Sequence, residues 1–258
     1  MLIKFVAPLS LALFACHSSF AAMPLITDDT GTQGAGGNQI EISFTEDKST
    51  EDDITSKSQQ VPAVTLTRGL TDTIDLFVAG TWLRNSSDDP AVETEKGMSN
   101  TVLGAKWRLF ENDRKTSVAV KAAYALPVSE AKQNRGLGDG EASWDGTLIL
   151  SQEMPFGSVH ANAGVGKVGV KNGDDEKTTH VSVAPMFDLG ETTKLVFDLG
   201  QDTSKPDGGE KSTSRYWEAG LIYAPSKAVD LAVGYIRAKD KDSAVVTKTF
   251  TGGLTWRF

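Results

Sequence analysis

Six charged side chains stand at every second position of segments whose other positions are largely apolar, and these six are best placed to do chemistry. They are Lys106, Arg108, Lys121, Asp145, Asp198 and Glu218. Charges of both signs on one wall of an enclosed path would either offer polar contacts to a solute or pair with each other and fill the path. We therefore expect these residues to line the inside of a larger structure.

Histidine chemistry is limited to His160 and His180 once the N-terminal segment, which contains His17, is set aside. In a hairpin centred near residue 173 these two side chains would lie several residue pairs apart, so we expect them to share neither a metal ion nor a proton. The sequence shows no His/Ser or His/Asp constellation. It predicts no enzyme, no metal site and no cofactor.

Glycine-rich and acidic stretches are interpreted as loops. Gly31–Gly37 has no apolar strand before it and no Lys-Ser/Thr after it, so it is a flexible leader rather than a phosphate loop. Gly136–Gly140 and the acidic clusters at 51–53, 88–89 and 174–176 lack the spaced ligands of a calcium loop. We expect solvated loop tips, linked to lipopolysaccharide phosphates through divalent ions.

Alternation with a period of two dominates the chain from residue 39 onward. One example is the face formed by Thr101, Leu103, Ala105, Trp107 and Leu109. Such runs recur to give about twelve strands, several of about ten residues, which is the length that spans a membrane. Short turns near residues 70, 112, 156, 190 and 225 alternate with mostly longer connections near 52, 91, 134, 173, 207 and 240.

A soluble barrel or sandwich would also alternate, with its apolar face turned inward. Aromatic residues near the strand ends favour a membrane, because aromatic girdles mark the two lipid interfaces. The predicted girdle consists of Trp82, Trp107, Tyr124, Trp144, Tyr223, Tyr235, Trp256 and Phe258. The sequence thus predicts an all-β fold, an antiparallel transmembrane β-barrel in the bacterial outer membrane, with short periplasmic turns and longer extracellular loops.

The last stretch, Phe250 to Phe258, has one apolar aromatic face and ends on Phe258. It resembles the closing strand of outer-membrane barrels, whose assembly machinery reads such a C-terminal aromatic residue. At the closure, matching parity would place Arg257 beside Glu41 on the inner side, and we expect a salt bridge there worth about 1 kcal/mol or less.

Residues 1–21 have the features of an export signal: Lys4, an apolar run of about ten residues and a small-x-small cleavage site. The only cysteine, Cys16, would be removed with it; alternatively, Leu13-Phe14-Ala15-Cys16 is a lipobox and Cys16 is lipidated. The net charge of −8 argues against a nucleic-acid partner. The domain plan is then a signal at 1–21, a glycine-rich leader or plug at 22–38 and a barrel at 39–258.

Two motifs are distinctive: Met23-Pro24-Leu25-Ile26-Thr27-Asp28-Asp29-Thr30-Gly31-Thr32-Gln33-Gly34 and the hairpin Arg68-Gly69-Leu70-Thr71-Asp72. With them the mature chain resembles the outer-membrane proteins of the phenol-degradation MetA-pathway family. The resemblance implies a barrel that passes small, hydrophobic or aromatic compounds, with outer-membrane lipid and lipopolysaccharide around it. The alternative is a structural or surface-interaction barrel with a closed lumen.

Overall fold

A computed structural model describes residues 23–51, 54–241, 243 and 245–258. The export signal at 1–21 and Cys16 lie outside the described residues. In the described part of the chain, no helix is long and apolar enough to cross a membrane.

Thirteen strands and one short helix make up the described structure. The strands are β1 (Asn38–Glu51), β2 (Ile54–Gly69), β3 (Ile74–Ser87), β4 (Glu95–Met98), β5 (Val102–Glu111), β6 (Thr116–Ala125), β7 (Ser143–Met154), β8 (Gly157–Val168), β9 (Glu176–Asp188), β10 (Thr193–Pro206), β11 (Ser212–Ser226), β12 (Val229–Asp240) and β13 (Val246–Arg257), and the helix is α2 (Glu130–Gln133). Apart from the four-residue β4, every strand has 10 to 16 residues, because the alternating pattern extends over most of each strand. The register shifts only at local irregularities, for example between Gln60 and Ala63 of β2 and between Arg108 and Phe110 of β5.

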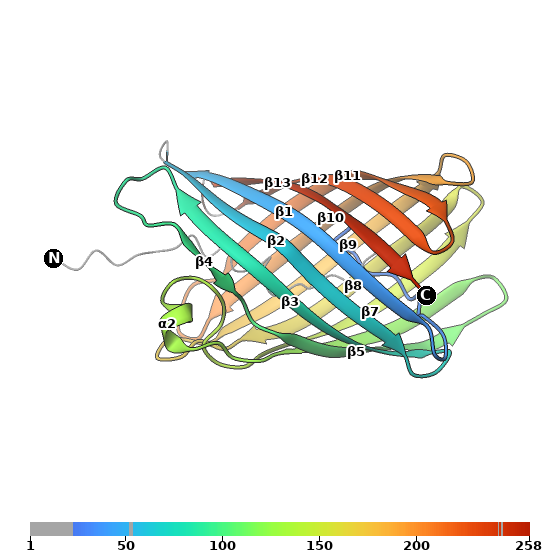
Figure 1. Ribbon diagram of the computed structural model, residues 1–258, viewed down its shortest axis with the longest axis horizontal. Helices are drawn as coiled ribbons and strands as arrows, with labels where there is room; N and C mark the ends of the chain where they lie inside the picture. The colour runs from blue at the N-terminus through green and yellow to red at the C-terminus, as the bar shows by residue number, and fades with distance from the viewer. Residues whose placement is uncertain (1–22, 52–53, 242, 244) are drawn as a thin grey trace.

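All strands except β4 form one closed antiparallel barrel (Figure 1). Each strand pairs with the next along the chain, and β1 closes the ring by pairing with β13. Asn38 and Phe258 exchange two backbone hydrogen bonds of 2.9 and 3.0 Å at this closure. A closed ring leaves no unpaired sheet edge, which a strand protein in lipid requires. The predicted twelve-stranded barrel is confirmed, with β4 as one additional strand beside β3.

The two faces of the wall differ in chemistry as the alternation predicts. On β5, Trp107 is 51 % exposed on the outer face, whereas its neighbour Lys106 is 6 % exposed on the inner face. Most large apolar side chains along the other strands also point outward, whereas the inside contains the buried polar side chains and a smaller number of apolar ones, such as Phe77 and Ile149. The interior of this protein is therefore largely polar, as in other membrane barrels.

Connections at the two ends of the barrel differ in length. At the periplasmic end the turns are short, and the start of β1 and the end of β13 meet there. At the extracellular end, the β3–β5 connection contains β4 and the β6–β7 connection contains α2; both lie at the left in Figure 1. The expected long loop near residue 52 is wrong: β1 continues to Glu51 and β2 starts at Ile54, because polar alternation extends both strands beyond the apolar band.

Candidate functional site

The leader lies inside the barrel, against the inner wall. Leu25, Thr27, Asp28 and Thr30 are each at most 5 % exposed, and they contact inward-facing side chains of several strands. The sequence predicted a flexible leader or a plug here, because the segment has no periodic apolar pattern. In the structure its order comes from contacts with the wall instead.

Asp28 is bound by two lysines of neighbouring strands. Its carboxylate oxygens lie 2.8 Å from Lys106 Nζ on β5 and 2.9 Å from Lys121 Nζ on β6. Lys106 and Lys121 are directly opposite each other in the sheet, where two like charges would destabilise the pair. Burial opposes ionisation of Asp28, yet the two ammonium groups outweigh it and lower the pKa of this carboxyl to about 2.

Asn162 on β8 holds the backbone of the same residue. Its side-chain oxygen accepts from the amide of Asp28 at 2.6 Å, and its nitrogen donates to the carbonyl of Asp28 at 2.9 Å. This double contact imitates the pairing of two strands. Asp28 is therefore fixed through both its charge and its backbone.

Thr27 is held by the next strands around the ring. Its amide donates to Asp198 Oδ2 at 2.7 Å, and its hydroxyl lies 2.8 Å from Asp198 Oδ1 and 2.7 Å from Ser182 Oγ. Tyr216 Oη also donates to Asp198 at 3.1 Å. Asp198 is 0 % exposed, so this carboxylate serves the leader and not the solvent.

The N-terminal end of the described leader packs through apolar contacts. Leu25, 2 % exposed, lies in a cluster with Ala184, Met186, Val196 and Ile222. Beside it, Gly220 and Gly234 are paired across β11 and β12, and a Cβ on either would come within 2.5 to 2.7 Å of Pro24. These two glycines thus make room for the leader.

The other end of the leader is attached at the periplasmic rim. Gln33 N lies 3.0 and 3.1 Å from the two carboxylate oxygens of Asp75. Gly36 and Gly37 exchange backbone hydrogen bonds with Gly69 at the end of β2. From this rim to Leu25, the leader follows the wall around the lumen.

The six predicted inner charges face the lumen, but most do not border an open path. Lys106, Lys121, Asp198 and Glu218 are each at most 8 % exposed. Asp145 is half-buried on β7, with its Oδ2 atom fully enclosed. Arg108 lies near the periplasmic rim, where it contacts Glu111 at 3.2 Å and the carbonyl of Asp72 at 3.0 Å. Of the two expected arrangements, a polar path or charges that pair and fill the lumen, neither describes the structure fully, because Lys106, Lys121 and Asp198 pair with the leader instead.

Sequence periodicity did not identify Thr27 and Asp28 as site residues. Alternation identifies inward positions on strands, whereas the leader has no period from which to read a direction. One signal was present: two lysines opposite each other on a wall predict an anion between them.

A Ser–His–Asp arrangement corrects a second expectation, that no such constellation exists. His180 Nδ1 lies 2.7 Å from Asp202 Oδ1, and His180 Nε2 lies 2.9 Å from Ser182 Oγ. The distances are those of a catalytic triad. However, Ser182 Oγ accepts a hydrogen bond of 2.7 Å from Thr27 Oγ1 of the leader. In this state the arrangement links the leader to the wall.

His160 has a separate environment between Ser151 and Ser158, with contacts of 2.8 and 2.9 Å. It is opposite Ala184, whereas His180 is opposite Gly164. The structure therefore does not bring the two histidines into one site. Within the described ranges, no group of three His, Cys, Asp or Glu side chains is arranged to hold a metal ion.

The predicted salt bridge between Glu41 and Arg257 is wrong, although β1 and β13 do pair. Arg257 is opposite Gln39, and Glu41 is opposite Thr255, one inward position further along. Arg257 Nη2 bonds Asp230 Oδ2 of β12 at 2.7 Å, and its Nε donates to Gln39 Oε1 at 3.1 Å. The register, which parity alone does not determine, gives Arg257 a different partner.

The predicted aromatic residues lie on the outer face. All but one have 42 to 58 % of their surface exposed: Trp82, Trp107, Tyr124, Trp144, Tyr223, Trp256 and Phe258. Tyr235 is half-buried because its ring packs between Trp217 and Phe250, with centroid distances of 5.6 and 5.0 Å. Their contact with lipid interfaces stays a prediction.

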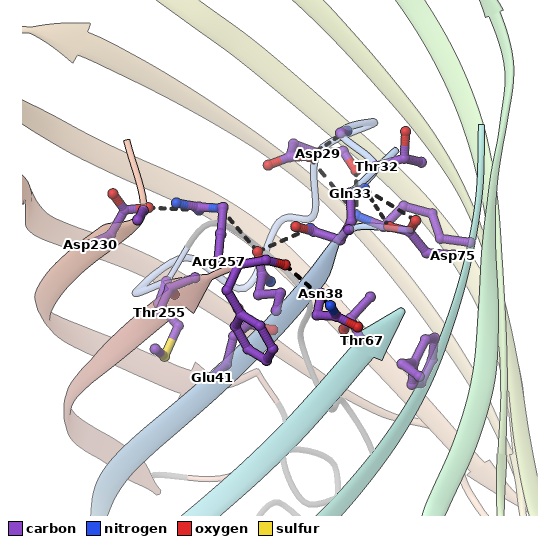
Figure 2. Close-up of a pocket in the computed structure, with 18 of the residues that line it drawn as sticks. Asp29, Thr32, Gln33, Asn38, Glu41, Thr67, Asp75, Asp230, Thr255 and Arg257 are labelled. Carbon is purple, nitrogen blue, oxygen red and sulfur yellow. Dashed lines mark hydrogen bonds and ion pairs between the residues drawn. The ribbon is translucent and has the colours of Figure 1, made fainter. Parts of the chain in front are cut away.

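A cavity of about 520 Å³, here called the mouth cavity, lies between the leader and the wall at the periplasmic end. In Figure 2 the leader residues Asp29, Thr32 and Gln33 lie on one side of it, with Glu41 and Thr67 of the wall on the other. Arg257 and Asp230 border it near the rim. The leader thus leaves part of the lumen unfilled.

Several solved structures share this barrel. The COG4313 outer membrane channel from Pseudomonas putida F1 matches with a TM-score of 0.72 at 12% identity, over 89% of this chain and 98% of that one. The translocator domain of the autotransporter NalP from Neisseria meningitidis matches with a TM-score of 0.55 at 10% identity, over 89% and 91%. The β domain of the Bordetella autotransporter BrkA matches with a TM-score of 0.56 at 12% identity, over 87% and 100%. At these identities the likeness shows the fold of outer-membrane barrels, which places the chain in the outer membrane.

No functionally curated protein matches the chain. A family model does match, over residues 26–258, and its description is "Putative MetA-pathway of phenol degradation". The match begins within the leader, so the leader and the barrel are covered together. The chain belongs to this outer-membrane family.

Proposed function

We propose that the protein is an outer-membrane channel for small molecules, and that the leader closes its lumen. The observation that carries the proposal is the position of Asp28, ion-paired inside the barrel with Lys106 and Lys121. A barrel of twelve strands encloses more space than eight-stranded barrels, whose side chains fill the interior. Here a separate segment occupies part of that space, and a segment can leave without breaking the wall.

Hydrophobic or aromatic compounds are the proposed solutes. The family description supports this class, because it refers to phenol degradation. The solved barrel with the highest of the three TM-scores is itself named an outer membrane channel. Thr27 and Asp28 contact the wall through hydrogen bonds and ion pairs, which water or a polar solute can replace. This supports a leader that can be displaced from the lumen.

A structural barrel with a permanently closed lumen is the second candidate, favoured by the full burial of Leu25, Thr27 and Asp28. Single-channel recording in planar bilayers separates the two functions. We expect rare, small steps from residues 22–258 and regular, larger steps from a variant that lacks residues 23–37. Phenol, but not glycerol at the same concentration, should reduce the current of this variant. A folded deletion variant without conductance would contradict the channel and support the structural barrel.

A further inference from the structure

The mouth cavity contains two acceptor atoms that the protein itself does not satisfy. Among the residues that the structure describes, Glu41 Oε2 and Thr67 Oγ1 have no hydrogen-bond partner. Both residues line the cavity, and each is only 6 % exposed. A buried carboxylate oxygen without a donor is costly, so such an atom calls for a donor from outside the chain.

The cations around the cavity are already used. Lys106 binds Asp28 at 2.8 Å, and Arg257 binds Asp230 at 2.7 Å. Lys227 is exposed on the β11–β12 turn at the rim. The inner part of the cavity therefore has an excess of negative charge, centred on Glu41.

Two other carboxylates of the cavity add to this excess of negative charge. Asp75 binds the backbone amide of Gln33, and Asp29 lies 3.9 Å from Lys106 Nζ, beyond hydrogen-bond distance. An anionic ligand would face three carboxylates, of Asp29, Glu41 and Asp75. A cation with its own N–H groups matches both the charge and the missing donors.

Part of the lining is apolar and suits an organic group. Phe77, Met23 and Ile222 border the same cavity, and an aromatic ring also attracts a cation placed over its face. The volume of about 520 Å³ lies within the range of about 300–1,000 Å³ that is typical of small-molecule pockets. From these observations we propose that the mouth cavity binds a small organic ammonium ion, with its N–H groups on Glu41 and Thr67 and its apolar part against Phe77 and Met23.

This site deepens the proposed channel function, since it gives one class of solute a binding point at the periplasmic mouth. Its test does not depend on transport. Calorimetric titration of residues 22–258 in detergent micelles with benzylammonium, benzyl alcohol and benzoate should show binding of benzylammonium alone. Glu41→Gln keeps the shape and removes the charge, and should weaken binding at least tenfold. Thr67→Val should weaken it less, and Asp113→Asn, on an exposed periplasmic turn, should leave it unchanged.

Heat-modified gel migration checks that each variant is folded. Equal binding of benzylammonium and benzyl alcohol, unchanged affinity in Glu41→Gln, or no binding to the unmodified protein would each overturn the site. Conductance of the variant lacking residues 23–37 would still support the channel in those cases. Benzylammonium binding without any conductance would support the site and contradict the channel.

Discussion

The leader and the barrel wall are held by different kinds of interaction. The wall is a closed ring of backbone ladders, in which every strand pairs with two neighbours. The leader, by contrast, is held mainly by side chains such as Asp28, Thr27 and Leu25. Backbone ladders are broken only together, whereas side-chain contacts can be removed singly. We therefore expect that the leader can be released without unfolding the barrel.

Asp28→Ala should have the largest effect on the leader. It leaves Lys106 and Lys121 buried and opposed, and removal of one partner of a buried ion pair costs about 3–5 kcal/mol. The exposed population of the leader should rise at least a hundredfold, measured as the maleimide reaction rate of a cysteine placed at Thr30.

Asp29→Asn is the matched control, because the Asp29 side chain is more exposed than that of Asp28 and lies 3.9 Å from Lys106 Nζ, beyond hydrogen-bond distance. It should change the reaction rate less than tenfold. Equal rates for the two variants would show that the ion pairs do not hold the leader.

Leu25→Ala should release the leader next most strongly, at the lower end of the range of about 2–5 kcal/mol for buried leucines. The thermal unfolding of the barrel should stay the same, because the lost contacts belong to the leader. Leu221→Ala is the control, since Leu221 is 44 % exposed on the outer face of β11. A lower unfolding temperature of the barrel with no change in leader labelling would show that Leu25 stabilises the wall and not the leader.

Acid should release the leader through Asp28. Its pKa in the bound leader is about 2, below the ordinary value of 3.8, so its contribution is complete above about pH 4 and is lost as the pH falls toward 2. The difference corresponds to about 2 kcal/mol. Labelling at Thr30 should be constant from pH 7 to about pH 4.5, when corrected for thiolate content, and should rise below it. In Asp28→Asn this rise should be absent.

Arg257→Leu should have the smallest effect, a slight loss of stability of the barrel wall. The ion pair with Asp230 is partly exposed, with 37 and 22 % of the side chains accessible, and should contribute about 1 kcal/mol or less. In double-mutant cycles of urea unfolding, Arg257 should couple to Asp230 and not to Glu41. Stronger coupling to Glu41 than to Asp230 would contradict the observed ion pair and support the Glu41–Arg257 salt bridge that parity predicted.

Sequence periodicity was sufficient to predict the strands of the barrel wall and the inward or outward direction of their side chains. The outward Trp107 and inward Lys106 follow from a period of two, which is a local property of the backbone. Register was not available from that pattern, so Arg257 was given the wrong partner. The strand β4 and helix α2 are too short to show a period.

The candidate site was harder to predict than the wall. The contacts of Thr27 and Asp28 join residues more than 75 positions apart, and nothing in the leader itself shows its direction. The arrangement of Ser182, His180 and Asp202 also depends on the register of β9 with β10. The opposed lysines were the part of the site that hairpin pairing could have identified.

Locking the leader in place tests whether it closes the lumen. Thr30 Oγ1 and Ser117 Oγ lie 2.5 Å apart, and cysteines at both positions in residues 22–258 would join the leader to β6. In planar bilayers at about pH 3, where Asp28 begins to be protonated, the oxidised protein should stay closed and the reduced protein should conduct. Equal conductance in both states would contradict the claim that the leader closes the lumen.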